Sequence, residues 1–91
     1  MASYIIMYYI YVLKSKRDNK LYIGYTNNLK RRLKEHNDGL VAITKHRKPF
    51  KLIFYEAFSN QQDATAREKF LKTGWGRRHL QKALKNYFAG R

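Results

Sequence analysis

Two short apolar runs with a polar stretch between them open the chain and predict a β-hairpin. The first run, from Tyr4 to Leu13, contains no charged residue and is dominated by β-branched and aromatic side chains, which favour strands. We expect a strand from Tyr8 to Lys14, a turn in the polar residues 15–20, and an antiparallel strand from Leu21 to Tyr25. Gly24 in the second strand indicates a bulge or a place where the backbone approaches another group closely.

The alternation of side chains along a strand divides this hairpin into two faces. In the first strand, Tyr9 and Tyr11 share one face, and Ile10 and Val12 lie on the other. The hairpin loop decides whether Tyr22 lies on the face of Tyr11. An even number of loop residues puts the two tyrosines on the same face and an odd number puts them on opposite faces. The sequence alone allows both registers.

A basic helix is predicted directly after the hairpin, from Leu29 to Asn37, with Gly39 closing it. Three polar residues that can cap a helix precede it: Thr26, Asn27 and Asn28. The spacing i, i+4, i+7 predicts an inward stripe of Leu29, Leu33 and His36. Arg32 lies at the border of this stripe, one turn before His36. The outward face carries Lys30, Arg31 and Lys34.

The second half of the chain predicts one more strand and two helices. Lys51 to Phe58 alternates as a strand does, at an edge of the sheet. A capping box of Ser59 and Gln62 would open a helix from residue 60 to about residue 73, which Gly74 would end. The last helix is expected over residues 77–88, with Trp75 filling the gap between the two helices.

These elements predict an α+β fold in the order ββαβαα, a small three-stranded antiparallel sheet flanked by helices. The length of 91 residues is that of a single domain, which we expect to span 1–91 with a core over about 8–73. The apolar run near the start is too short to cross a bilayer, so we expect neither a signal peptide nor a membrane span. The absence of cysteine fits a cytoplasmic protein and excludes disulfides and thiolate metal sites.

The charge narrows the class of partner. Twenty Lys and Arg against six acids give a formal net charge of +14, which favours nucleic acid. Phosphate contacts that do not read sequence are expected from the outward face of the basic helix and from the loop of residues 40–49. The residues concerned are Lys30, Arg31, Lys34, Lys45, Arg47 and Lys48. A solvated charged face and a structural ribosome-associated protein are the alternatives.

The order of short motifs makes the chain resemble the GIY-YIG nuclease superfamily, over Tyr8 to about Lys72. The motifs are Tyr9-Ile10-Tyr11, Tyr22-Ile23-Gly24, Asn28-Leu29 with Arg32, and Glu68 in the helix after the third strand. The chain looks like the small single-domain members of that superfamily, with Tyr9 where the first motif has glycine. Other members include the endonuclease module of nucleotide-excision repair and some homing and restriction endonucleases.

The resemblance implies a metal-dependent endonuclease that hydrolyses DNA phosphodiester bonds, in DNA repair or recombination on branched or damaged DNA. Tyr11 would activate the attacking water, and His36, which matches a histidine common in small members, would assist proton transfer. Tyr22 would line the site, Gly24 would let the backbone approach the phosphate, and Arg32 would stabilise the phosphate. Such nucleases often take their target choice from an attached domain, so a protein partner or nucleic-acid shape would supply specificity here.

Glu68 would hold one divalent metal ion, Mg²⁺ or Mn²⁺, according to the same resemblance. It shares a helix face with Ala64 and Leu71, and a carboxylate on such a face usually has a partner. One protein carboxylate suits Mg²⁺, which keeps several waters and takes phosphate oxygens as ligands. The alternative is an i, i+4 ion pair with Lys72.

The other site residues have structural alternatives as well. Tyr11 and Tyr22 could be ordinary strand tyrosines, Arg32 a solvated helix residue, and His36 a core histidine. A tyrosine with an ordinary pKa of about 10 is a weak base at neutral pH, so catalysis would need neighbouring groups to assist it. A non-catalytic nucleic-acid-binding module that keeps the fold is therefore the competing function.

Overall fold

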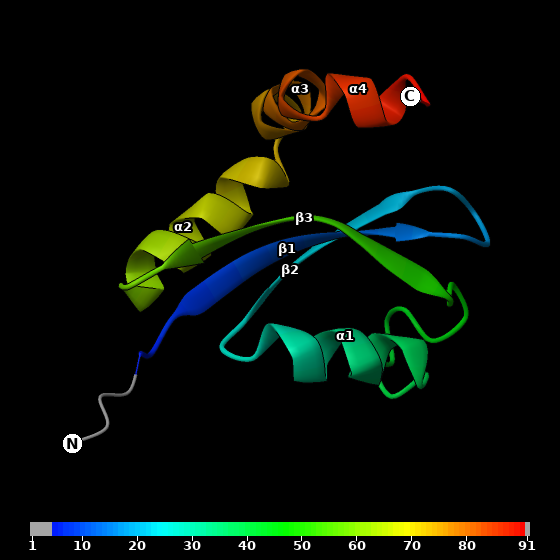
Figure 1. Ribbon diagram of the computed structural model, residues 1–91, viewed down its shortest axis with the longest axis horizontal. Helices are drawn as coiled ribbons and strands as arrows, with labels where there is room; N and C mark the ends of the chain where they lie inside the picture. The colour runs from blue at the N-terminus through cyan, green and yellow to red at the C-terminus, as the bar shows by residue number, and fades with distance from the viewer. Residues whose placement is uncertain (1–4, 91) are drawn as a thin grey trace.

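A three-stranded antiparallel sheet lies between two layers of helix in the computed structural model, which describes residues 5–90 (Figure 1). The strands are β1 (Tyr8–Ser15), β2 (Leu21–Thr26) and β3 (Phe50–Phe58), in the order β2-β1-β3. The helices are α1 (Leu29–Asn37), α2 (Gln61–Leu71), α3 (Gly74–Ala83) and α4 (Lys85–Phe88). The α+β class is confirmed, and β3 is an edge strand as expected.

The register of the hairpin resolves the question of the two tyrosines. Tyr11 pairs with Gly24 and Leu13 pairs with Tyr22 across the β1–β2 ladder. Paired residues point to the same face of a sheet, and so do residues two apart along a strand. Tyr11, Tyr22 and Gly24 therefore all lie on one face, the face that α1 covers.

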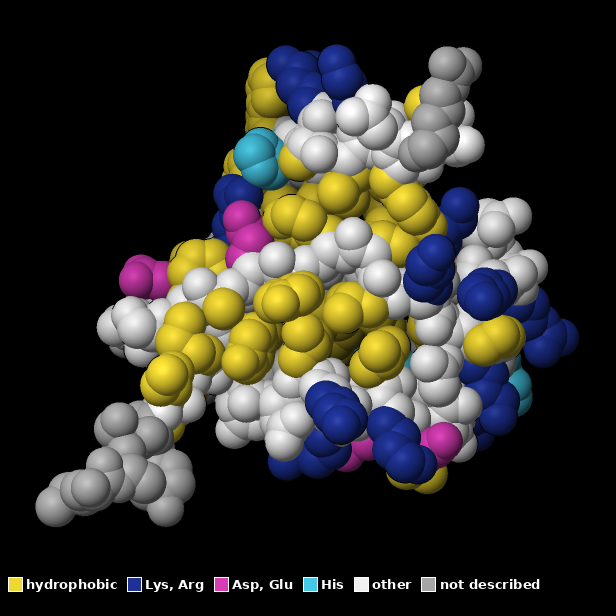
Figure 2. All heavy atoms as spheres, viewed as in Figure 1, with side chains coloured by type: hydrophobic (Ala, Val, Ile, Leu, Met, Phe, Trp, Pro, Cys, Tyr) yellow, Lys and Arg dark blue, Asp and Glu magenta, His cyan; other side chains and the backbone are white. Residues whose placement is uncertain are grey.

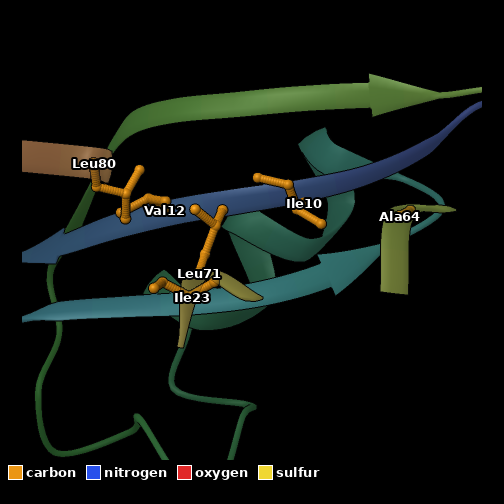
Figure 3. Close-up of a cluster of buried hydrophobic side chains, with 6 residues drawn as sticks. All are labelled: Ile10, Val12, Ile23, Ala64, Leu71 and Leu80. Carbon is orange, nitrogen blue, oxygen red and sulfur yellow. The ribbon is translucent and has the colours of Figure 1, made fainter. Parts of the chain in front are cut away.

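Each face of the sheet has its own core. Under α1, Tyr11, Leu13 and Phe50 are buried, and Leu29 and Leu33 of the helix pack against them. The opposite face is covered by α2 and α3, and its buried side chains point toward one another from strands and helices (Figure 3). They are Ile10, Val12, Ile23, Ala64, Leu71 and Leu80. Central strand β1 thus carries buried side chains on both faces, which explains its nearly continuous apolar sequence.

Helix α1 forms as predicted. Asn28 is its N-cap and accepts a hydrogen bond from the backbone N–H of Arg31, while Gly39 follows the C-cap with a φ of 76° that favours glycine. The side chain of Asn37 exchanges two hydrogen bonds with the backbone of Phe50, at 2.6 and 3.1 Å. This pair fastens the end of α1 to the start of β3, so the helix has a fixed position over the sheet.

The predicted ends of the later helices were wrong at three points. The N-cap of α2 is Asn60, which accepts from the N–H groups of Gln62 and Asp63, and the Ser59–Gln62 capping box does not form. Gly74 begins α3 after the N-cap Thr73 instead of ending α2. The last helix then divides at Leu84, whose φ of −114° and ψ of 27° interrupt the helical backbone, so the element order is ββαβααα.

Trp75 does not fill the gap between α2 and α3, as the sequence led us to expect. The Trp75 side chain is 72% exposed. Gly76 makes the helix contact, because a Cβ at this position would overlap the carbonyl oxygen of Phe70 and lie 2.5 Å from Cα of Leu71. The backbones approach too closely for any side chain between them. Within residues 5–90, moreover, the structure has no helix long and apolar enough to cross a membrane.

Candidate active site

The centre of the candidate site is a hydrogen-bonded pair under α1. Tyr11 stands in the middle of β1, and His36 is in the last turn of α1. The phenol oxygen of Tyr11 lies 2.9 Å from Nε2 of His36. Tyr11 is 2% exposed and His36 is fully buried. The sheet and the helix therefore hold the two rings in one relative orientation.

Thr44 completes a chain of polar contacts that sets the tautomer of His36. Its hydroxyl oxygen lies 2.7 Å from Nδ1 of His36, and its hydroxyl points to the carbonyl oxygen of Val41 at 3.4 Å. If the Thr44 hydroxyl donates to Val41, as this geometry allows, Thr44 accepts from Nδ1–H of His36. Nε2 is then unprotonated and accepts the O–H of Tyr11. Sequence reasoning missed Thr44 because it lies in an irregular loop whose path no periodicity predicts.

The environment keeps His36 uncharged. Burial, with a smaller contribution from the positive charge of Arg32, lowers the pKa of the imidazole from 6.5 to about 4, against the raising effect of Glu35. A neutral imidazole at neutral pH can take a proton from Tyr11, which an imidazolium cannot do. The alternative of a satisfied core histidine describes its packing correctly, but His36 also presents a free lone pair to a phenol.

Tyr11 is held as a neutral phenol. Burial raises its pKa above 10, and the negative charges of Tyr22, when ionised, and of Glu68 act in the same direction. The guanidinium of Arg32, close to the phenol oxygen, offsets part of this increase. Contact with Tyr11 in turn raises the pKa of Arg32, so the two side chains are electrostatically coupled. A phenolate here would need Arg32 and a proton acceptor together, and the site contains both.

Gly24 has a role toward Tyr11 that the structure shows directly. A Cβ at Gly24 would overlap Cζ and the hydroxyl oxygen of Tyr11. The register passes through Gly24 without a shift, and the irregularity in the sheet lies instead between Val12 and Leu13, facing β3. Of the two readings of this glycine, the close approach is the one observed, and the approaching group is the Tyr11 ring. Its role toward a phosphate stays a prediction.

Two further predicted residues, Tyr22 and Arg32, lie beside this pair and are half-buried. The ring of Tyr22 lies 5.1 Å from that of His36 and 6.4 Å from that of Tyr11, between centroids. The Arg32 side chain is 34% exposed and donates to the Glu35 carboxylate at 3.1 Å. Tyr11, Tyr22, Arg32 and His36 thus converge on one place, although they come from two strands and a helix.

Glu68 approaches from the other layer of helix. The side chain is 21% exposed and its carboxylate accepts from the Lys72 ammonium at 2.9 Å, which is the i, i+4 pair weighed as the structural alternative. Helix α2 packs on β1 and β2, and the charge of Glu68 is one cause of the raised pKa of Tyr11. The carboxylate is therefore part of the same electrostatic environment as the phenol.

The sequence was compared with protein families. The model of the GIY-YIG catalytic domain matches residues 7–81, which include every site residue described above. The chain belongs to the GIY-YIG family. The resemblance inferred from its motifs is thereby confirmed.

Relatives of this GIY-YIG protein carry a common family name. The present chain is 48% identical to a UPF0213 protein of Clostridium perfringens, over 72% of this chain and 71% of that protein. It is also 48% identical to the UPF0213 protein YazA of Bacillus subtilis, over 71% and 66% of the two chains. The solution NMR structure of a UPF0213 protein from Bacillus halodurans is similar, with 32% identity, a TM-score of 0.54, and 88% and 86% of the chains covered. These names state no reaction, so the relatives show the family and the fold.

The acidic groups of the GIY-YIG domain offer little for a metal. Within residues 5–90 there is no group of three or more His, Asp or Glu side chains that could bind a metal together. Glu56 of β3 accepts two hydrogen bonds from the Arg67 guanidinium, at 2.7 and 3.2 Å. Glu68 remains as a single carboxylate near the phenol, a donor set that fits Mg²⁺ or Mn²⁺ sharing its other positions between waters and phosphate oxygens.

The cationic residues expected to contact phosphates divide into two groups. Figure 2 shows Lys and Arg side chains gathered around α1 and the hairpin end of the sheet. Arg47 is committed to the fold, since it binds Asp18 at 2.7 Å and lowers the pKa of that carboxyl to about 2. Arg31 and Lys34 pair with acids on their own helix. Lys30, Lys45 and Lys48 are exposed, and no ion pair is found for them in the described part of the chain.

Proposed function

We propose that this protein is a metal-dependent endonuclease that hydrolyses DNA phosphodiester bonds. The observation that carries the proposal is the Tyr11–His36–Thr44 chain, which joins a phenol to an uncharged imidazole of fixed tautomer. In a protein that only bound nucleic acid this contact would serve to satisfy the buried phenol, whereas a nuclease also needs the proton acceptor that it provides.

The residues can move a proton away from an attacking water. As the water oxygen bonds to phosphorus and the bond from phosphorus to the leaving oxygen breaks, one water proton passes to the Tyr11 oxygen while the phenol proton passes to Nε2 of His36. Thr44 holds the imidazole so that this nitrogen is the acceptor throughout. The positive charge of Arg32 next to the phenol stabilises the developing negative charge, and its guanidinium can bind two phosphate oxygens.

A divalent metal held by Glu68 would polarise the phosphate and stabilise the leaving oxygen. Lys72, which pairs with Glu68, would then turn toward the phosphates. The surface that a substrate meets consists of the half-buried Tyr22, Arg32 and Glu68, because Tyr11 beneath them is almost fully covered. Access to the phenol is thus limited to a group that fits between these side chains.

DNA is the proposed substrate, and branched or damaged DNA in repair or recombination is the proposed context. The net charge of +14 supports a polyanion, and the exposed lysines supply contacts to any backbone. Such contacts position a duplex without reading its sequence. Target choice would then come from DNA shape or from a protein partner.

A non-catalytic binding module is favoured by one observation, the burial and raised pKa of Tyr11. If that alternative holds, the phenol is a structural group and the protein binds DNA without a metal.

An assay with nicked, flapped and branched DNA separates the two functions. The nuclease cleaves at least one of these substrates in Mg²⁺ or Mn²⁺ and none in excess chelator, and Glu68→Ala abolishes cleavage while leaving binding in chelator unchanged. Asp63→Ala, which removes an exposed carboxylate from the first turn of the same helix, is the matched control and keeps full activity. Metal-independent, salt-sensitive binding with no cleavage of any substrate would establish the binding module instead.

A further inference from the structure

Trp75 is the only tryptophan of the chain, and the fold does not use it. Its side chain is 72% exposed at the start of α3, whereas the neighbouring Gly76 makes the contact with α2. A large aromatic ring in water loses the burial that usually accounts for its presence. Its position leaves the indole free to contact a ligand.

The surroundings of Trp75 keep the ring both ordered and accessible. One turn further along α3, the Arg78 guanidinium lies 5.2 Å from the ring centre, within the range of a cation–π contact. On the other side in sequence, a Cβ at Gly74 would meet nothing within 4 Å, and its backbone does not need glycine. Gly74, Trp75 and Arg78 line a surface pocket of about 320 Å³. The glycine leaves open a space that an ordinary side chain would narrow.

A basic pocket connects the candidate active site with α3. Its volume is about 290 Å³, and its lining includes Tyr22 of the site together with Lys72 and Arg77. Arg77 directly precedes Arg78 in α3. A polyanion that passes Tyr22 thus meets the positive charges of Lys72 and of Arg77 on α3.

We propose that Trp75 and Arg78 form a stacking platform for an unpaired base of a single-stranded nucleic acid. This inference rests on the proposed function for the nature of the ligand and specifies its form. An indole face stacks on any base, and a neighbouring guanidinium adds a charge for the backbone. Bases within a duplex are already stacked, so only a single-stranded segment can use the platform. The charge of α3 and of the adjoining pocket favours this occupant over an apolar protein surface.

The fluorescence of the single tryptophan tests the platform in chelator, where no cleavage occurs. A single-stranded oligonucleotide, in DNA and RNA forms, is compared with an abasic strand of the same length and a blunt duplex. Binding of each is measured separately by the anisotropy of a labelled probe. The oligonucleotide quenches Trp75, whereas the abasic strand binds without quenching. Trp75→Ala weakens oligonucleotide binding by about 5-fold or more and leaves binding of the abasic strand unchanged, and Trp75→Phe retains most of the affinity.

Two results overturn the platform, and they differ in what they say of the proposed function. The platform is refuted if the oligonucleotide binds without quenching Trp75, or if Trp75→Ala binds the oligonucleotide with wild-type affinity. In either case the protein still binds nucleic acid, and Trp75 remains available to a protein partner. If none of the four probes binds, the platform and the proposed function fail together. If Trp75 is quenched and the DNA and RNA oligonucleotides differ in affinity, the platform is supported, and the difference shows which of the two strands it prefers.

Discussion

At the scale of single residues, most side chains of the candidate site were predicted from the sequence, and one, Thr44, was not. The motif tyrosines, Arg32 and His36 were predicted from spacing and resemblance, and the structure brings them together. Thr44 could not be predicted, because its contact with His36 crosses an irregular loop. The sequence also could not tell that Gly24 makes room for the Tyr11 ring, since that depends on the register of the hairpin.

Thr44→Val tests the importance of the fixed tautomer. The substitution keeps the shape of the side chain but removes the only acceptor found for Nδ1–H within the described structure. We expect a loss of about 1–3 kcal/mol in the free energy of unfolding, because a buried donor is left unsatisfied. Urea denaturation measures it. Thr44→Ser should restore most of the stability, and Thr65→Val on α2 should change it by less than about 0.5 kcal/mol. Equal stability of the Thr44→Val and wild-type proteins would contradict the proposed hydrogen bond.

The lowered pKa of His36 predicts a pH dependence of stability. Above about pH 6.5 the imidazole is neutral in both the folded and unfolded states and contributes no slope. Between 6.5 and about 4 only the unfolded state binds the proton, so stability falls as the pH falls through this range. The full loss is on the order of 3 kcal/mol. Denaturation curves across the range should show the slope in wild type and in His46→Gln, and a reduced slope in His36→Gln. The same slope in all three proteins would show that His36 does not cause this pH dependence.

At the scale of elements, the sequence predicted the strands and the helix whose apolar residues recur with a regular period. The three strands and α1 have strong alternation or a clear apolar stripe, and their bounds differ from prediction by one residue at most. The later helices were misplaced because Gly74 and Gly76 look alike in sequence. One begins a helix and the other marks a close backbone crossing, a distinction that only the packing of α2 against α3 makes.

Alanine at these two glycines should act in opposite directions. Gly74→Ala meets nothing and removes backbone freedom from the unfolded chain, so it should raise the free energy of unfolding by about 0.4–1 kcal/mol. Gly76→Ala would overlap the backbone of Phe70 and should cost about 2 kcal/mol or more. Thermal or urea unfolding of the two variants and of the wild type measures both changes in stability. A destabilised Gly74→Ala together with a tolerated Gly76→Ala would show that α2 and α3 do not cross as described.

At the scale of the whole molecule, the charge is distributed between fold and surface. The composition predicted a polyanionic partner. It could not show that Arg47 forms an ion pair with Asp18, because the two residues are far apart in sequence. The exposed lysines near α1 are the groups left for a duplex backbone.

The salt dependence of duplex binding should reflect this division. Replacing Lys30, Lys45 and Lys48 together by Gln should reduce the slope of log affinity against log salt by about 1 for each lost phosphate contact. Lys69, Lys82 and Lys85, which are exposed on the other helices, provide a triple Gln control that removes the same number of charges. Anisotropy titrations over a range of salt concentrations supply the slopes. Identical slopes for both variants would remove these lysines from the interface.

The most direct test of the central claim is the rate at which Tyr11→Phe cleaves DNA. The substrate is whichever nicked, flapped or branched DNA the wild type cleaves, measured in single turnover with Mg²⁺ or Mn²⁺. The variant keeps the ring over Gly24 and loses only the hydroxyl, so it should fold, at a cost of about 1–3 kcal/mol because Nε2 of His36 loses its partner, and bind DNA as wild type does. Loss of the proton transfer should slow cleavage by about 100-fold or more. A Tyr11→Phe protein that cleaves at the wild-type rate would contradict the role assigned to the Tyr11–His36 pair.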